Sequence, residues 1–147
     1  MDTPFAIQQF LLAQEALTDV VGPNVFLLEL GTQNDGTRSP TFDAEMPTQC
    51  TVVRAAPGIA THGSATLMLN DGRVNMVSYG QTPHLAYNVD SLVYQALKYL
   101  KPSVWAETYI HWVRPLTRPI QLRDPTTQWP YVVSVWQTLA SDVTIAA

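Results

Sequence analysis

The 147-residue chain is poor in charged residues, in cysteine and in long apolar runs. Only 14% of its residues are charged, whereas an average soluble domain has about 25%. With 8 Lys and Arg against 12 Asp and Glu, the formal net charge is −4. That balance argues against a general basic field for holding nucleic acid. A surface with so few charges must expose many neutral groups, and we expect a partner to cover part of it.

The single cysteine, Cys50, cannot form an internal disulfide, and no Cys/His cluster has the spacing of a zinc site. Because Thr51, Val52 and Val53 follow it, we predict a small buried strand residue, with a reactive thiol as the alternative. We see no secretory signal, and no apolar stretch approaches the ~18 residues of a membrane span. We therefore expect folding and assembly in a reducing cytoplasm, with no membrane partner.

Residue types that serve in catalysis are present without the spacing that catalysis needs. His62, His84 and His111 lie in three different contexts, and none has a partner at metal-ligand spacing. We expect His84 to be exposed at a helix start and His111 to have a structural role in a strand. Asp43 and Glu45 are close carboxylates, but their polar surroundings favour a solvated pair over an acid–base device. No phosphate-binding loop and no nucleophile elbow is present. We expect no enzymatic activity, no metal and no cofactor.

Hydrophobic patterning predicts one α+β domain over residues 1–147, with an antiparallel sheet and two main helices mostly on one face. The first helix begins at Thr3-Pro4 and ends at Gly22-Pro23. Thr82-Pro83 begins the second, whose apolar stripe includes Leu92. We expect strands at residues 25–30, 48–55, 65–70, 73–79, 104–114, 120–123 and 131–139.

Two shorter signals add detail to the sheet. Asp71-Gly72 lies between two β-rich runs and predicts a tight hairpin turn. Trp112 and Trp136 lie inside long β-rich runs, and we assign both to the core.

Residues 31–47 show neither helical nor strand periodicity. A structureless loop of this length is uncommon in a compact domain and often carries function. We take Asn34, Asp35 and Arg38 as candidate contacts with a subunit or partner. A solvated loop without a role is the alternative.

The C-terminal β region holds three of the few cations, with Pro115 and Pro119 interleaved. Because proline is confined to edge strands, we expect this segment to form a sheet edge or an excursion from the sheet. Arg and Trp are enriched at interface hot spots, although arginines on a solvated face are an equal alternative. The candidate interface residues here are Arg114, Arg118, Arg123 and Trp129. Trp129 lies next to Pro130 near a turn and is the tryptophan that we expect to be exposed.

Four stretches of the chain resemble the tail terminator proteins of long-tailed bacteriophages, a group also called minor capsid or neck proteins. They are ALTDVVGPNVF at residues 16–26, TQCTVVRAAPG at 48–58, RVNMVSYGQTPHLAYNVDSLVYQALKYL at 73–100, and PIQLRDPTTQWPYVVSVWQTLA at 119–140. Together they cover most of the chain. Residues 31–47 depart from the family's pattern, because they are longer than a compact connection.

The resemblance implies a virion protein that forms a hexameric ring on the finished tail tube. Such a ring ends tube polymerisation and joins the tail to a head-side connector or stopper protein. DNA passes through the ring without specific binding. The alternatives are another neck or head-completion adaptor, or a small ligand-binding α+β domain.

Overall fold

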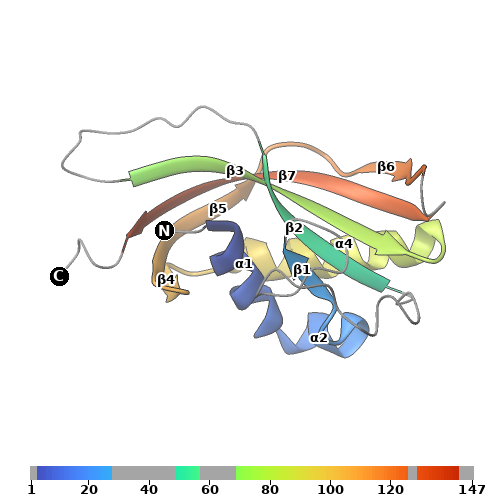
Figure 1. Cartoon of the computed structure of the whole chain (residues 1–147), viewed down its shortest axis with the longest axis horizontal. Helices are drawn as coiled ribbons and strands as arrows, with labels where there is room; N and C mark the ends of the chain where they lie inside the picture. Colours follow the sequence, from blue (N-terminus) through green and yellow to red (C-terminus); the bar gives the residue numbers. More distant parts are fainter. Residues whose placement is uncertain (1–2, 28–48, 57–68, 126–128, 143–147) are drawn as a thin grey trace.

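The computed structural model describes residues 3–27, 49–56, 69–125 and 129–142. In this part of the chain, seven strands form one mixed, curled sheet with the order β1-β2-β3-β7-β5-β4, and β6 pairs with β7 beside that path (Figure 1). Three helices of the described residues lie on one side of this sheet (Figure 1). The predicted α+β class, with its helices on one face, is therefore confirmed.

The sheet is mostly antiparallel. It is built from β1 (Val25–Leu27), β2 (Gln49–Ala56), β3 (Leu69–Gly80), β4 (Ser103–Trp105), β5 (Thr108–Pro115), β6 (Ile120–Arg123) and β7 (Pro130–Asp142). Only the pair β1–β2 is parallel among these described strands. Strand β7 is central, because β3 runs along one of its sides while β5 and β6 share the other.

The predicted hairpin at Asp71-Gly72 is wrong. Both residues lie inside β3, where they pair with Leu139 and Thr138 of β7. The Thr138 hydroxyl donates a hydrogen bond of 3.3 Å to the carbonyl oxygen of Gly72. An Asp-Gly pair turns the chain only when the two flanking runs pair with each other, and here the second partner of β3 is β2.

The predicted strand at residues 104–114 is instead a β4–β5 hairpin. Ala106 and Glu107 form its two-residue turn, with φ of 48° and 60°. Positive φ at both central positions matches the twist of a hairpin, but Asn and Gly are the usual residues there. The sequence therefore carried no recognisable turn signal at this point.

The predicted first helix is divided into α1 (Thr3–Leu12) and α2 (Glu15–Val21). Gln14 is extended, with φ −90° and ψ 106°, and its side-chain amide donates to the Phe10 carbonyl oxygen. The break lets the two helices bury different faces, since α1 packs on the sheet and α2 also packs on α4 (Pro83–Lys98). Gly22 ends α2 with φ +60°, as predicted.

Helix α4 begins as the sequence predicts. The Thr82 hydroxyl accepts a hydrogen bond from the Leu85 amide, and Pro83 occupies the first turn. Gly80, the last residue of β3, lies so close to α4 that an added Cβ would overlap the Ala86 backbone nitrogen. The helix is thereby fixed tightly against the end of β3.

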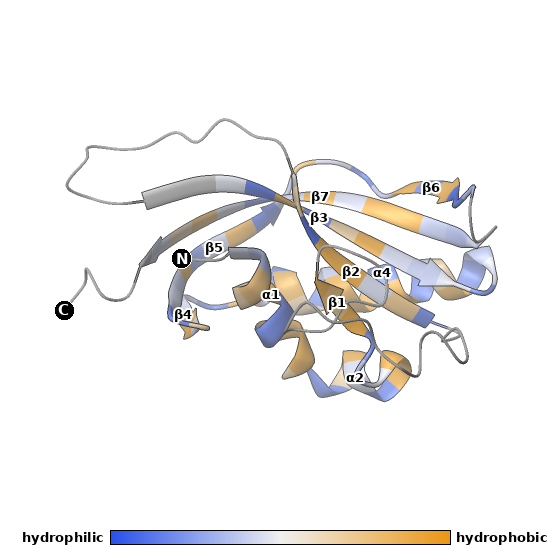
Figure 2. Ribbon diagram, viewed as in Figure 1, coloured by the Kyte–Doolittle hydropathy of each residue, from blue (hydrophilic) through white to orange (hydrophobic). Residues whose placement is uncertain are grey.

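The main core lies between the helices and the sheet. Figure 2 shows hydrophobic residues in both layers. Trp136 is buried there, as predicted. A second apolar cluster lies on the other face of the sheet, because strand side chains alternate between faces. It contains Cys50, whose predicted burial is confirmed. Trp129, predicted to be exposed, is half-buried and packs against this cluster.

Trp112 is also corrected, because it is half-buried rather than part of the core. A register shift between Ile110 and Trp112 places a bulge in β5. Ile110 therefore faces the helices, whereas Trp112 pairs with Leu139 on the opposite face of the sheet.

Candidate interaction surface

The most distinctive surface of the described chain is the segment at residues 114–123, here called the arginine segment. It leaves β5 at Pro115, loops outward and returns to pair with β7 as β6. All four residues of β6 are exposed. The predicted sheet edge is confirmed, and its apolar side chains are Leu116, Ile120 and Leu122, exposed by 42%, 57% and 48%.

The arginine segment is held to β7 at both ends. Its loop is tied by a 2.8 Å bond from the Leu116 amide to the Val135 carbonyl oxygen. The Val135 amide donates in return to the Thr117 hydroxyl at 3.3 Å. Further along, Ile120 and Leu122 stand in register with β7. The exposed side chains are therefore presented on a fixed backbone, which lowers the entropy cost of binding through them.

The three arginines of the segment differ in their surroundings. Arg114 stacks on the Trp112 ring at 4.6 Å and donates two hydrogen bonds, of 3.0 and 2.8 Å, to the Gln137 side-chain oxygen. Arg123 is exposed and keeps an interaction within the chain. Within the described residues, no hydrogen bond or ion pair holds the exposed Arg118 guanidinium. Arg118 is the cation of this segment best placed to meet a partner.

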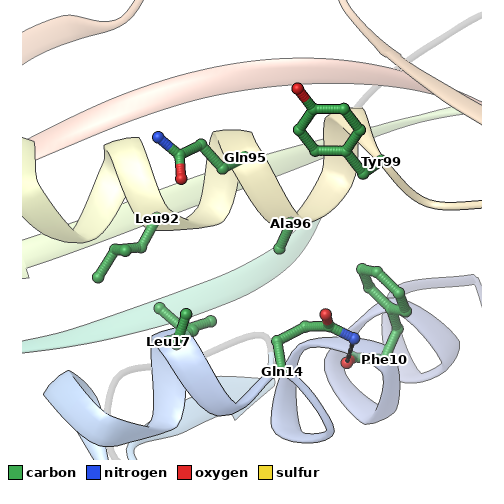
Figure 3. A pocket seen from close by; sticks show the side chains of 8 residues that line it. Phe10, Gln14, Leu17, Leu92, Gln95, Ala96 and Tyr99 are labelled. Atoms are coloured by element: carbon green, nitrogen blue, oxygen red, sulfur yellow. Dashed lines mark hydrogen bonds between the residues drawn. The ribbon is translucent and has the colours of Figure 1, made fainter.

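A second surface feature lies between the helices. A pocket of about 260 Å³ separates α1 and α2 from α4 (Figure 3). Its lining is mostly apolar: Phe10, Gln14, Ala16, Leu17, Leu92, Gln95, Ala96 and Tyr99. We call it the helix pocket. Tyr99, at its rim, is 73% exposed, and the volume lies below the ~300–1,000 Å³ of typical small-molecule sites.

Helix α2 borders the helix pocket, and both of its charged residues are acidic. Ala16 and Leu17 line the pocket, while Glu15 and Asp19 are exposed. These two carboxylates are four residues apart and so lie on the same side of the helix. Val20, next to Asp19, is a further exposed apolar side chain.

In the described part of the chain, the titratable groups whose pKa burial raises are Cys50, Tyr79 and Asp90. Burial raises the pKa of the Cys50 thiol to about 12, so the thiol is protonated and unreactive at neutral pH. Burial also raises the pKa of Tyr79 to about 12, and its hydroxyl donates to the Asp124 carboxylate at 3.4 Å. Asp90 of α4 is only 5% exposed, and burial raises its pKa, while a hydrogen bond with Ser134 opposes that shift.

No metal-binding cluster and no membrane-spanning helix is present in the residues that the structure describes. They contain no group of three or more His, Cys, Asp or Glu side chains that could hold a metal ion. None of their helices has the length and apolar character needed to cross a bilayer. His84 is exposed, as predicted, and His111 lies 3.0 Å from the Ser141 hydroxyl in a structural contact.

The structure brings together some of the predicted interface residues. Arg114, Arg118 and Arg123 lie on one segment, whereas Trp129 is turned toward the second apolar cluster. Asn34, Asp35 and Arg38 lie outside the described residues, as do His62 and the pair Asp43 and Glu45. Sequence reasoning missed the helix pocket, because the pocket depends on the break between α1 and α2.

One comparison, with solved structures, found a chain of similar fold. The chain is an α+β protein with one curled mixed sheet and a single helical layer in its described part. No family model matches it, and no curated protein matches it in sequence. It is similar to a chain in a solved structure described as "Virion of native gene transfer agent (GTA) particle", with 16% identity and a TM-score of 0.59. The match covers 94% of this chain and 93% of that chain.

Proposed function

We propose that this protein is a structural component of a phage-like particle. The observation that carries the proposal is the fold match to a chain of an assembled virion particle, which extends over nearly the full length of both chains. The exposed side chains of Leu116, Ile120 and Leu122 support the same conclusion, because a partner would remove their apolar surface from water.

Within that class, we propose the role of tail terminator. In this role the protein forms a hexameric ring on the tail tube, blocks addition of the next tube ring, and provides the surface for the head-side connector. The sequence resemblance over residues 16–26, 48–58, 73–100 and 119–140 supports this role. A negative net charge suits a ring through which DNA passes without adhering.

The proposed function is tested by removing the protein from an assembling particle. Loss of a tail terminator leaves tubes of uncontrolled length that carry no heads, visible by electron microscopy. Loss of a head-completion adaptor instead leaves tails of normal length that remain unattached. Particles with normal, joined tails would contradict both roles.

A mass measurement tests the ring. Native mass spectrometry of the purified protein, alone and with purified tail tubes, is expected to show a species of six copies. A chain that stays monomeric under both conditions is inconsistent with the terminator ring.

A further inference from the structure

We infer that the arginine segment of one copy binds the helix pocket and the α2 carboxylates of the next copy. The inference rests on the proposed ring and names the two surfaces that close it. The occupant of the helix pocket is then a second copy of this chain, and neither surface requires residues outside the described structure.

Shape is the first argument. The helix pocket is an apolar hollow with an exposed rim at Tyr99, and about 260 Å³ gives room for an aliphatic side chain rather than a typical small molecule. The arginine segment presents Leu116, Ile120 and Leu122 on a backbone fixed to β7. The helix pocket therefore has room for an apolar side chain, and the arginine segment exposes several.

Charge is the second argument. Residues 114–123 include Arg114, Arg118 and Arg123 and no acidic residue. Helix α2 includes Glu15 and Asp19, both exposed, and no basic residue. The chain has only 8 cations, and three of them lie on the arginine segment. This concentration of positive charge, opposite in sign to the charge of α2, favours a contact between these two surfaces. Arginine also forms planar, two-pronged hydrogen bonds to carboxylates, which fix the orientation of a contact.

Placement is the third argument. Strand β6 and helix α2 lie at opposite margins of the molecule, with the sheet between them (Figure 1). A protein whose complementary surfaces are on opposite sides cannot satisfy both in one two-fold dimer. It associates head to tail, and such association closes into a ring when the rotation between copies allows it. Two surfaces so placed suit the ring architecture proposed above.

Charge reversal on each surface provides the test. The variants are Arg118→Glu on the segment and Asp19→Arg on α2, because both side chains are exposed. Glu107→Arg is the matched control, since Glu107 is an exposed carboxylate in the β4–β5 turn, which belongs to neither surface. Thermal unfolding of each variant is compared with wild type first, so that loss of folding is recognised.

We expect Arg118→Glu and Asp19→Arg each to raise the concentration for half-assembly at least about tenfold, because like charges then face each other. The Glu107→Arg control is expected to assemble as wild type does. An equimolar mixture of the two defective variants is expected to assemble again. In that mixture the two variants can alternate around the ring. At every second contact the glutamate introduced at position 118 then meets the arginine introduced at position 19, and at the other contacts the original Arg118 meets the original Asp19. Native mass spectrometry should find equal numbers of the two variants in each ring.

A second arm probes the helix pocket directly. Ala16 is exposed and lines the pocket, so Ala16→Trp fills the pocket with little disturbance of the core. We expect this variant to remain folded and to assemble at least about tenfold more weakly, because the apolar contact is blocked.

The outcomes separate this inference from the proposed function. If wild-type rings form but Arg118→Glu and Ala16→Trp assemble normally, the ring stands and the assignment of its interface is overturned. If both single variants fail and their mixture also fails, positions 19 and 118 do not face each other, which again overturns the assignment. If wild type forms no ring with or without tail tubes, the proposed ring itself fails and the inference falls with it.

Discussion

At the scale of single residues, Asp90 is the side chain whose environment is least expected from the sequence. It lies between Val89 and Val93 on the buried side of α4 and contacts Ser134 of β7. The Ser134 hydroxyl also accepts a 3.0 Å hydrogen bond from the Trp136 indole. A carboxyl group in this position is easier to bury protonated than ionised.

The raised pKa of Asp90 predicts a pH effect on stability. A folded-state pKa above the unfolded value means that the carboxyl group stabilises the fold at low pH, below its ordinary value of 3.8. That contribution is lost as the pH rises through the folded pKa. We therefore expect Asp90→Asn to raise the melting temperature at neutral pH by a few degrees and to change it little at acidic pH.

Melting curves of wild type and Asp90→Asn from about pH 3 to 7 check this prediction. Asp90→Ala is the control, because it removes the charge and also the hydrogen bond to Ser134. An Asn variant that is less stable than wild type at neutral pH would show that the ionised carboxylate is well accommodated.

Gly80 and Gly22 are required for different reasons: Gly80 because a side chain would not fit, and Gly22 because of its backbone conformation. At Gly80 an added Cβ meets the backbone of Ala86 and Leu85, which cannot move without shifting α4. At Gly22 a Cβ meets nothing, but φ is +60°. We expect Gly22→Ala to cost about 1 kcal/mol of unfolding free energy and Gly80→Ala about 2–3 kcal/mol. Urea denaturation measures both, and equal costs would contradict the close approach of β3 and α4.

At the scale of elements, the sequence predicted best where the signal is local. The cap at Thr82, the proline at Pro83 and the apolar stripe fix α4 almost to the residue. The edge position of β6 was predicted from Pro115 and Pro119, which precede the strand. These features depend on neighbours in sequence, which a single chain displays directly.

The elements that were mispredicted depend on distant partners. Asp71-Gly72 lies inside a strand because β7 pairs across it. Ala106-Glu107 turns because β4 and β5 meet there, although neither residue favours positive φ. The scarcity of cations in the sequence was enough to select the arginines as candidate interface residues. The helix pocket could not be predicted in this way, because it exists only in the three-dimensional arrangement of α1, α2 and α4.

The helical stripe of α4 is not uniformly buried, and a mutation series can show this. Leu97 is 1% exposed in the main core, while Leu92 is half-buried at the helix pocket. We expect Leu97→Ala to cost about 2–5 kcal/mol, and Leu92→Ala to cost about half as much, because part of its surface is already in water. Urea denaturation of both variants tests the difference, and equal losses would place Leu92 fully in the core.

At the scale of the whole molecule, scarcity of charge makes the few exposed charges informative. An interface that joins Arg118 to the α2 carboxylates combines exposed ion pairs with an apolar contact at the helix pocket. Salt acts differently on these two parts. Between about 0.1 and 1 M salt, the Debye length falls from about 10 to 3 Å, which screens exposed ion pairs. The apolar contact is not weakened by such screening.

Ring assembly should therefore weaken as sodium chloride is added. Variants of Arg118 and Leu116 should separate the contribution of the ion pairs from that of the apolar contact. We expect the half-assembly concentration of wild type to rise about tenfold between 0.1 and 1 M salt. Arg118→Gln should assemble more weakly at low salt and show a flatter salt dependence, because one charge has been removed. Leu116→Ala should weaken assembly by a similar factor at every salt concentration, since Leu116 contributes apolar surface only. Sedimentation velocity across the salt series measures all three, and a salt dependence that Arg118→Gln leaves unchanged would place the ion pairs elsewhere on the ring.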